Sequence, residues 1–221
     1  VPYGPDAVWN YELGIKTSWF DRRLTLNAAL YQIDWKDIQT SAQTLSGCCS
    51  FIVNAGKARI RGVEFEYMAR PMAGLSISGG LTFSEPELLE DQLNPNIRDS
   101  TSLGDKGDQI PDISKFSAST SVDYVWPVND AFDGMLRLDY SYIGKSYSHF
   151  RPTNTYYEKQ GDFGVVNLRT GLEGSDWGAY VFVRNVFDIY GAYSVSSGAG
   201  SEQLVNSTQP RTVGVNLRKS F

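Results

Sequence analysis

Apolar and polar residues alternate one by one along long stretches of the chain. Between residues 9 and 19 the odd positions are large and mostly apolar, and the even positions are polar or glycine. Residues 75–83 and 116–126 repeat this alternation, with mainly serine on the polar side. Side chains two positions apart lie on the same face of a strand, so each stretch predicts a strand with one face in an oily environment.

The alternation predicts nine strands, many of them ten or more residues long. Strands of soluble proteins are mostly about 5–6 residues long, so these are unusually long. The phase of the second strand changes near Tyr31, which predicts a β-bulge, and in the eighth strand either set of alternate residues could face outward. The predicted strands are residues 8–20, 24–38, 57–70, 75–84, 113–126, 134–147, 163–173, 177–187 and 210–221.

The connections between these strands alternate strictly between short and long. Short turns at one end and long loops at the other are typical of an outer-membrane β-barrel, whereas a soluble β-sandwich, the alternative, has no reason to sort its loops. The stretch from Trp9 to Trp19 extends over about 33 Å. Tilted by about 40–45°, it matches the apolar band of about 25 Å of such barrels. The short connections are residues 21–23, 71–74, 127–133 and 174–176, and the long ones are residues 39–56, 85–112, 148–162 and 188–209.

The opposite face of the strands is polar. We expect Glu64, Glu66 and Arg169 to point into the barrel, where they meet water or protein rather than lipid. Single-chain bacterial barrels have an even number of strands and no open edge in lipid. Nine strands therefore predict an all-β, antiparallel transmembrane barrel of which residues 1–221 are the C-terminal portion, with extracellular long loops and periplasmic short turns.

The composition narrows the functional classes. Aromatic residues make up 13% of the chain, yet the mean hydropathy is −0.30, and no apolar run approaches the length of about 18 residues that a membrane helix needs. A net charge of −5 and a pI of 4.9 argue against nucleic acid as a partner. The acidic excess lies mainly in residues 85–112. Residues 1–10 have no export signal, so we expect any such signal to lie upstream.

Catalytic and metal-binding patterns are weak. Cys48 and Cys49 are adjacent and match no zinc or redox spacing; in an extracellular loop they could form a vicinal disulfide or bridge to cysteines elsewhere. His149 is the only histidine, so acid–base chemistry based on histidine would rest on one loop residue. We therefore expect no enzyme, no metal site and no cofactor.

Six stretches, in order along nearly the whole chain, resemble the TonB-dependent outer-membrane receptors. The resemblance implies a barrel of about 22 strands with a plugged lumen, and hence about 13 strands and a plug domain before residue 1. It also implies that substrate binds between the extracellular loops and the plug, and that the TonB complex pulls on an N-terminal motif to open the lumen. The six stretches are WNYELGIKTSWFDRRLTLNAALYQIDWKDIQ (residues 9–39), VNAGKARIRGVEFE (53–66), LRLDYSYIGKSY (136–147), VNLRTGLE (166–173), FVRNVFD (182–188) and GVNLRKSF (214–221).

The resemblance implies active uptake of a scarce nutrient across the bacterial outer membrane. A ferric siderophore is the default substrate; cobalamin, oligosaccharides and small aromatic compounds are alternatives, as is a passive porin. The expected partners are the TonB energy-coupling complex, the barrel-assembly machinery, outer-membrane lipid and lipopolysaccharide.

The loop of residues 148–162 and its flank gather the candidate ligand-binding residues. Arginine and aromatic rings suit an anionic, aromatic iron chelate through charge pairing and stacking. Alternatively, the tyrosines belong to the upper aromatic girdle of the barrel, and Arg151 faces lipopolysaccharide phosphate. The candidates are Tyr147, His149, Arg151, Tyr156 and Tyr157.

The last strand carries a second candidate signal. Its apolar face consists of Val213, Val215, Leu217 and Phe221. By resemblance to the family, an aromatic last residue on an alternating strand is the signal that the barrel-assembly machinery reads. Lys219 interrupts this face near the membrane border, where its long side chain could reach water.

Overall fold

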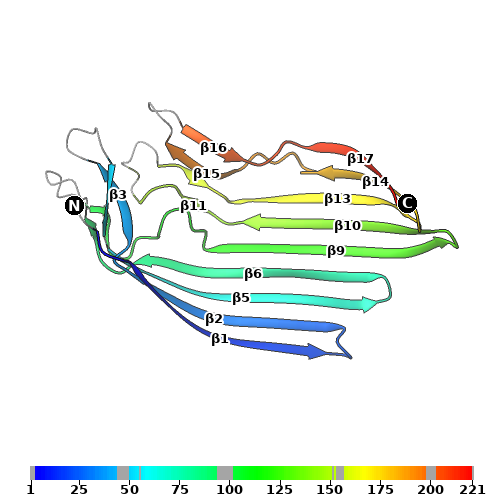
Figure 1. Ribbon diagram of the computed structural model, residues 1–221, viewed down its shortest axis with the longest axis horizontal. Helices are drawn as coiled ribbons and strands as arrows, with labels where there is room; N and C mark the ends of the chain where they lie inside the picture. The colour runs from blue at the N-terminus through cyan, green and yellow to red at the C-terminus, as the bar shows by residue number, and fades with distance from the viewer. Residues whose placement is uncertain are drawn as a thin grey trace.

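The computed structural model describes residues 3–43, 50–54, 56–93, 102–150, 152, 157–197 and 203–220. All regular structure in these residues is β-strand. The described residues contain no helix that is long and apolar enough to cross a membrane. Nine strands form one antiparallel sheet in which strands that follow one another in the sheet also follow one another in the chain (Figure 1). They are β1 (Ala7–Trp19), β2 (Leu24–Lys36), β5 (Lys57–Met72), β6 (Leu75–Leu88), β9 (Phe116–Asn129), β10 (Phe132–Ile143), β13 (Phe163–Glu173), β14 (Trp177–Arg184) and β17 (Thr212–Lys219).

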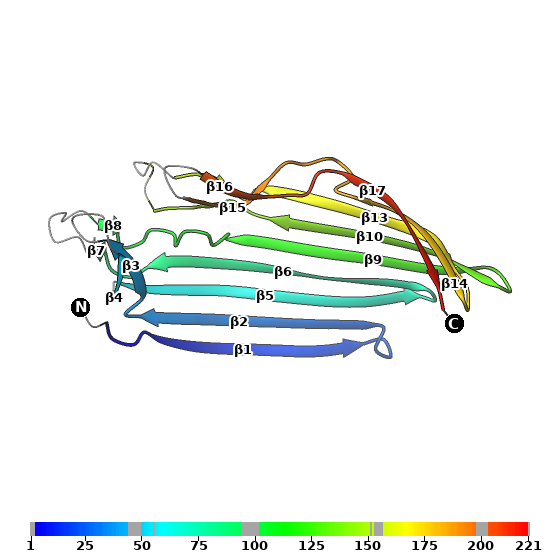
Figure 2. The same ribbon diagram turned by 45° about the horizontal axis from the view of Figure 1, so that its top comes forward.

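The sheet is a curved wall with unlike ends. Its tight turns lie at one end and its long connections at the other (Figure 1), which confirms the predicted sorting of short and long loops. Figure 2 shows that the wall bends across its width, so that β14 and β17 turn away from the plane of β1 to β6. The nine predicted strands are confirmed, with ends that shift by a few residues.

Each long connection also folds back on itself as a small two-stranded ribbon, which the sequence did not predict. The predicted strand 134–147 ends at Ile143, and Ser146–Tyr147 belongs to one of these ribbons. The pairs are β3 (Gln39–Gln43) with β4 (Ser50–Asn54), β7 (Gln92–Leu93) with β8 (Ser102–Gly104), β11 (Ser146–Tyr147) with β12 (Lys159–Gln160), and β15 (Ala192–Ser197) with β16 (Gln203–Ser207). The strands β7, β8, β11 and β12 have only two or three residues, too few to show a period-2 pattern.

The prediction of a β-bulge near Tyr31 is wrong. The strand β2 pairs with β1 and with β5 in unbroken register along its whole length. What changes at Tyr31 is the chemistry of the outward face: Leu30 lies opposite Val63, but Asp34 lies opposite Arg59, with an Oδ1–Nε distance of 2.6 Å. The change of phase therefore marks the height at which the outward face leaves an apolar environment.

At the same end of the sheet, the inner face changes from polar to apolar. Ala58, Pro86 and Leu88 point inward there and are almost completely buried. The connection that follows β6 covers them, since the amide of Leu88 donates to the carbonyl of Asp108 at 2.9 Å. Trp9 lies opposite Asp34, so it is above the apolar band. The band on β1 therefore ends near Tyr11 and is shorter than the predicted span from Trp9 to Trp19.

The register settles which residues of β14 face outward. Val181 lies opposite Val215, and Ala179 lies opposite Leu217, on the exposed side of the sheet. Tyr180, between them, points to the other side and is 3% exposed. The odd positions of β14 therefore continue the outward face of β17.

A buried asparagine joins the end of β14 to the segment before β17. The side-chain amide of Asn185 donates to the carbonyls of Ile189 and Gln209 at 2.9 and 2.8 Å, and its Oδ1 accepts from the amide of Ile189 at 2.9 Å. Asn185 has a φ of 50°, a left-handed conformation that asparagine tolerates better than most residues. The FVRNVFD stretch is thus a turn with a structural role.

Candidate functional site: a loop hairpin and the inner wall

The predicted ligand loop begins and ends in the ribbon of β11 and β12. Tyr147 lies opposite Lys159 in this ribbon. The rings of Tyr147 and Tyr157 stack with centroids 4.8 Å apart and an interplanar angle of 13°. The Lys145 Nζ lies 5.7 Å from the centroid of the Tyr147 ring. The ribbon therefore presents a pair of parallel aromatic rings next to a cation.

Asp162, which follows β12, forms an ion pair with a second lysine. The Lys159 Nζ lies 2.5 Å from Asp162 Oδ2, and the Tyr142 hydroxyl donates to Asp162 Oδ1 at 3.0 Å. The hydrogen bond from Lys159, followed by that from Tyr142, holds the pKa of the Asp162 carboxyl below its ordinary value. Burial raises the pKa of the Tyr157 hydroxyl, and the neighbouring Tyr147 adds to this effect. The Tyr157 hydroxyl is therefore neutral at physiological pH.

The structure brings together part of the predicted set. Tyr147 and Tyr157 are in contact, and the His149 Nδ1 lies 3.2 Å from Ser148 Oγ on the same segment. Arg151 and Tyr156 lie outside the described residues, as do Cys48, Cys49 and Phe221. Sequence reasoning missed Lys145, which precedes the loop, and Lys159, which lies within the loop near its end.

The ligand loop also packs on the acidic connection. The amide of Asp112 donates to the carbonyl of Tyr147 at 2.9 Å. Gly104 lies directly against the ring of Phe150 and the side chain of Leu88. Two loops that are distant in the sequence therefore form one surface at this end of the wall.

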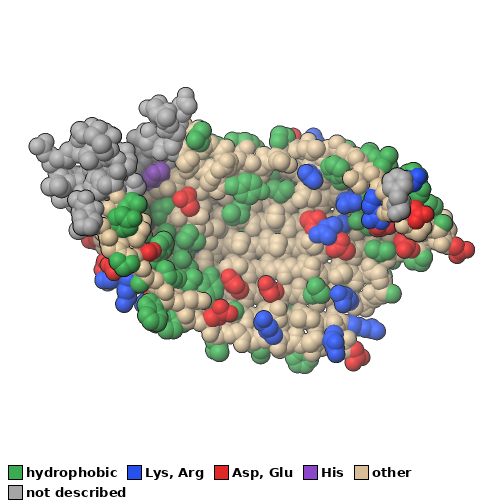
Figure 3. All heavy atoms as spheres, in the orientation of Figure 1, with side chains coloured by type: hydrophobic (Ala, Val, Ile, Leu, Met, Phe, Trp, Pro, Cys, Tyr) green, Lys and Arg blue, Asp and Glu red, His purple; other side chains and the backbone are tan. Residues whose placement is uncertain are grey.

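The inner face of the sheet is hollowed and carries clusters of acidic and basic side chains (Figure 3). The predicted inward direction of Glu64, Glu66 and Arg169 is confirmed by the register. Glu64 and Glu66 lie with Glu12 and Lys16 around a hollow of about 200 Å³ on β1, β2 and β5. The Asn27 amide donates to Glu66 Oε2 at 3.2 Å. This side of the inner wall is predominantly acidic.

The other side of the inner wall is rich in arginine. Arg137 bridges two acids, with distances of 3.3 Å to Asp123 Oδ1 and 3.0 Å to Asp139 Oδ2. The guanidinium carbon of Arg169 lies 4.0 Å from the centroid of the Tyr180 ring. Inner residues of β6 and β9 between the two sides are mostly serine and glycine, as in the pair Gly80 and Ser119.

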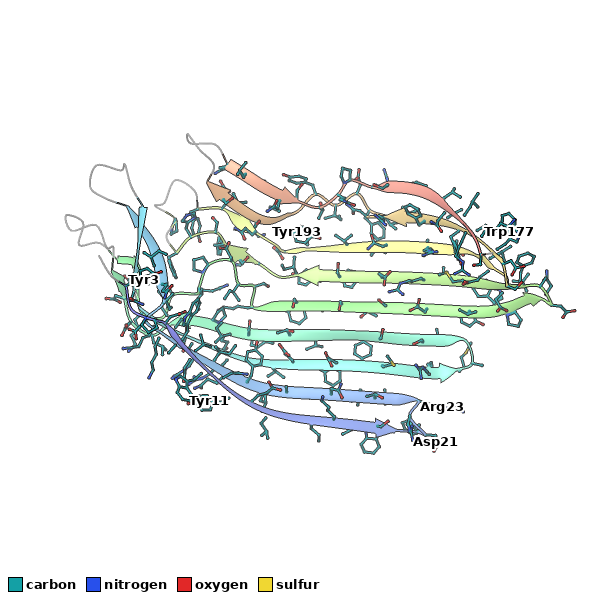
Figure 4. The ribbon with its side chains drawn as sticks, viewed as in Figure 1. Tyr3, Tyr11, Asp21, Arg23, Trp177 and Tyr193 are labelled. Atoms are coloured by element: carbon teal, nitrogen blue, oxygen red, sulfur yellow. The ribbon has the colours of Figure 1, made fainter. Side chains whose placement is uncertain are left out.

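The outward face of β17 has the predicted form. Val213, Val215 and Leu217 are all exposed, and Leu217 is 73% exposed. Lys219, which interrupts this face, has its Nζ 4.9 Å from the centroid of the Trp177 ring. Figure 4 shows Trp177 at the end of the wall where the tight turns lie, with Asp21 and Arg23 in the turn between β1 and β2. An aromatic and a cation at one border suit a membrane–water interface.

The described residues contain no group of three or more His, Cys, Asp or Glu side chains that could hold a metal ion. The contacts described at this site are ring stacking, charge pairing and hydrogen bonding.

Comparison with known proteins gives a consistent result. A family model described as "TonB dependent receptor-like, beta-barrel" matches residues 4–186. The chain is 28% identical over 210 residues to the ferrichrome outer membrane transporter/phage receptor of Escherichia coli K12, covering 86% of this chain and 25% of that protein. It is 36% identical over 83 residues to the ferric-pyoverdine M114 receptor PbuA of Pseudomonas sp. M114, covering 37% of this chain and 10% of that protein.

Solved structures give the same fold. The ferric yersiniabactin uptake receptor FyuA from Yersinia pestis superposes with a TM-score of 0.75 at 26% identity, covering 100% of this chain and 31% of that one. The ferric-catecholate import receptor Fiu from E. coli K12 superposes with a TM-score of 0.69 at 19% identity, covering 99% of this chain and 28% of that one. The chain thus spans about a quarter to a third of the length of these proteins.

Proposed function

Because this chain belongs to the TonB-dependent receptor-like β-barrel family, we propose that its protein takes up a ferric siderophore across the bacterial outer membrane. The observation that carries the proposal is the match of the whole chain to the ferric yersiniabactin receptor, at a TM-score of 0.75 and 26% identity. The two sequence relatives are also named for iron-chelate substrates. In this function the chain supplies barrel wall and loops.

The parts of the mechanism divide between this chain and the rest of the protein. Substrate binds at the end of the wall where the ribbons lie. Energy comes from the TonB complex, through a contact in a part of the protein that precedes these strands. We propose that residues 1–221 form the C-terminal portion of the barrel, after a plug domain and about 13 strands, since the family barrel has about 22 strands.

The ligand contacts that we propose are Tyr147, His149, Arg151, Tyr156 and Tyr157. The stacked pair of Tyr147 and Tyr157 offers a flat apolar surface, and Lys145 adds positive charge beside it. Aromatic stacking and charge pairing are the interactions that an anionic chelate with aromatic rings can use. Such a surface suits a catecholate or phenolate siderophore better than a neutral sugar.

We also propose that Val213, Val215, Leu217 and Phe221 form a signal that the barrel-assembly machinery recognises. The support is the exposed, regularly spaced apolar face of β17. Outer-membrane lipid and lipopolysaccharide are the remaining proposed partners, since the outward face is apolar below Tyr11 and charged above it.

The experiment is an uptake assay with the complete receptor in cells. Deletion of its gene should abolish energy-dependent uptake of one ⁵⁵Fe-labelled siderophore, and deletion of the TonB gene should have the same effect. Uptake that persists without TonB would indicate a passive porin, and loss of cobalamin or oligosaccharide uptake instead would refute the iron cargo.

A matched pair of variants tests the loop. Tyr147→Ala removes the ring that we propose contacts the ligand, and one aromatic contact is worth about 0.5–1.5 kcal/mol, so siderophore binding should weaken about 2- to 10-fold. Tyr147→Phe keeps the stack and should bind almost as the parent receptor does. Equal affinity of all three proteins would remove these rings from the binding site.

A further inference from the structure

A short segment that precedes β1 lies against the first long connection of the wall. It consists of residues 3–6, which are exposed to solvent and belong to no strand in the described part of the chain. Figure 4 shows Tyr3 at the end of the wall where the ribbons lie. An extended segment loses conformational entropy when it is ordered, so specific contacts have to hold it in place.

The side chain of Asn54, the last residue of β4, binds Gly4 through two hydrogen bonds. Its Nδ2 donates to the carbonyl of Gly4 at 3.0 Å, and its Oδ1 accepts from the amide of Gly4 at 2.7 Å. These bonds satisfy the N–H and the C=O of one residue together, as a paired residue does in an antiparallel ladder. Asn54 thus takes the place of a neighbouring strand at a point where β1 has not yet begun.

Two other side chains hold the same segment. The Gln39 Nε2 donates to the Gly4 carbonyl at 3.2 Å, and the indole Nε1 of Trp35 donates to Asp6 Oδ2 at 2.9 Å. Trp35 is near the end of β2, and Gln39 is the first residue of β3, directly opposite Asn54. The segment is therefore bound by β2, β3 and β4 at once.

Asn54 also fixes the point at which the chain leaves β2. Its Nδ2 donates to the carbonyl of Asp37 at 2.7 Å, and Asp37 has a left-handed φ of 55°. Aspartate tolerates this conformation better than most residues, and the turn directs the chain from β2 into the ribbon. One amide side chain therefore joins three backbone segments, which are residues 3–6, the turn after β2 and the end of β4.

We propose that Asn54 is a positioning residue, which joins the segment entering β1 to the ribbon of β3 and β4 so that both move as one body at the ligand-binding end of the wall. The inference rests on the proposed function for the ligand and for a further extracellular connection that leads into residues 3–6. The junction itself rests on the hydrogen bonds of Asn54, Gln39 and Trp35.

Two other junctions between neighbouring connections use backbone atoms. The amide of Asp112 donates to the carbonyl of Tyr147 at 2.9 Å, and the amide of Gly161 donates to the carbonyl of Ala192 at 2.9 Å. A change of side chain to alanine leaves such bonds in place. The junction at residues 3–6 depends on side chains instead, so a single substitution can open it.

The junction affects binding through the entropy of the loops. A ligand that binds between connections has to hold them in one arrangement, and connections that are already joined lose less freedom when it binds. Without the Asn54 side chain, the ligand itself has to order the segment and the ribbon. We therefore expect weaker binding of the ligand, with unchanged transport once the site is filled.

The first test is amide hydrogen exchange of the full-length receptor in lipid vesicles, without ligand. In Asn54→Ala, exchange should become about 10-fold faster in residues 3–6 and also in residues 39–43 and 50–54, because both parts of the junction are released. If this variant does not fold, Gly4→Pro removes the amide hydrogen from the other side of the junction, and faster exchange in the ribbon is again expected.

Asn206→Ala is the matched control for exchange. The Asn206 Nδ2 donates to Ser194 Oγ at 2.8 Å, within the ribbon of β15 and β16. Its removal takes away a ribbon asparagine that joins no second connection through this bond. Exchange in residues 3–6 should therefore be the same as in the parent receptor.

The second test is uptake of the ⁵⁵Fe-labelled siderophore that the parent receptor transports. Asn54→Ala should raise the KM about 2- to 10-fold with little change of the maximal rate, and saturating siderophore should restore slow exchange in the variant. Unchanged exchange, faster exchange in residues 3–6 alone, or an unchanged KM although the junction is open would each overturn the proposal. A receptor that takes up no iron chelate would refute the proposed function, and the exchange experiment would still decide whether Asn54 joins the two segments.

Discussion

The hydroxyl of Tyr67 lies 2.7 Å from Thr120 Oγ1, across the strand β6 that separates them. Both residues are on the outward face at the height of the apolar band. The ring of Tyr67 lies over Gly79, the residue of β6 between them. Lipid offers no hydrogen bonds, so two hydroxyl groups on a lipid-facing surface are stable when they bind each other.

Replacing Thr120 with the isosteric valine should destabilise the barrel. The substitution leaves the Tyr67 hydroxyl without a partner in lipid, and an unsatisfied polar group costs about 1–3 kcal/mol. The measurement is the free energy of unfolding of the complete receptor in lipid vesicles. The double variant Tyr67→Phe/Thr120→Val removes both hydroxyls and should be closer to the parent than Thr120→Val alone. A double variant that is less stable than the single one would contradict this account of the pair.

Gly79→Ala should be destabilising by about 1–3 kcal/mol, the usual cost of an overpacked site. An added Cβ would lie within 3 Å of the Ser119 carbonyl oxygen and of the Tyr67 hydroxyl, and the carbonyl cannot move away easily. Gly14→Ala is the matched control, because its Cβ would find only ordinary contacts of 3.5 Å or more. Unfolding of both variants in vesicles checks the prediction, and equal stabilities would show that the Tyr67 ring does not lie on Gly79.

Arginine substitutions should distinguish the two faces of the wall. Val122→Arg places a charge in the apolar band and should cost about 2–4 kcal/mol near the bilayer midplane, as should Leu13→Arg at a side chain that is 74% exposed. Ser119→Arg, on the inner face, should cost much less. The readout is again unfolding of the complete barrel in vesicles. Similar losses in all three variants would mean that the assignment of inside and outside is wrong.

Order in the β11–β12 ribbon should depend on pH through Asp162. Its pKa is held below the ordinary value of about 3.9 by Lys159, so the contribution of this contact is fully present above that ordinary value and is lost as the pH falls through the lowered one. Amide exchange in the ribbon, corrected for intrinsic rates, should be constant from about pH 7 to about pH 5 and should rise only in strong acid. Asp162→Asn should remove this dependence, and asparagine tolerates the φ of 64° at that position. A transition near neutral pH would assign the effect to another group.

Deletion of Phe221 should impair assembly more than stability. The residue belongs to the proposed signal on β17, which acts before the barrel is complete. The amount of folded receptor in the outer membrane should fall, while the unfolding free energy of the protein that does insert should change little. Phe221→Tyr keeps an aromatic side chain and should assemble. Normal insertion after the deletion would refute the signal.

The long strands were predictable because each of them has a sequence pattern that can be recognised without its neighbours. Lipid on one side and a polar interior on the other impose a period of two on every strand, and ten or more residues repeat it often enough to be read. This holds even in β2, where the register is unbroken although the pattern changes phase at Tyr31. The predicted bulge was wrong because the change of phase reflects the environment of the outward face and not an irregularity of the backbone.

The candidate site was only partly predictable. Tyr147 and Tyr157 lie ten residues apart, and only the pairing of β11 with β12 stacks their rings. The contact of Gly104 with Phe150 likewise joins two loops whose sequences carry no sign of each other. Short ribbons contain too few residues for a period, and their pairing is decided by the loops around them.

The sequence alone determined that this protein is a wall of long antiparallel strands with an apolar outer face, a polar inner face and its loops sorted to two ends. These are properties of single strands and their solvents, and each strand records them locally. The tertiary structure decided which groups meet across strands, such as Tyr67 with Thr120 and Arg169 with Tyr180. Such contacts depend on register and on side-chain direction, and these are set only when neighbouring strands align.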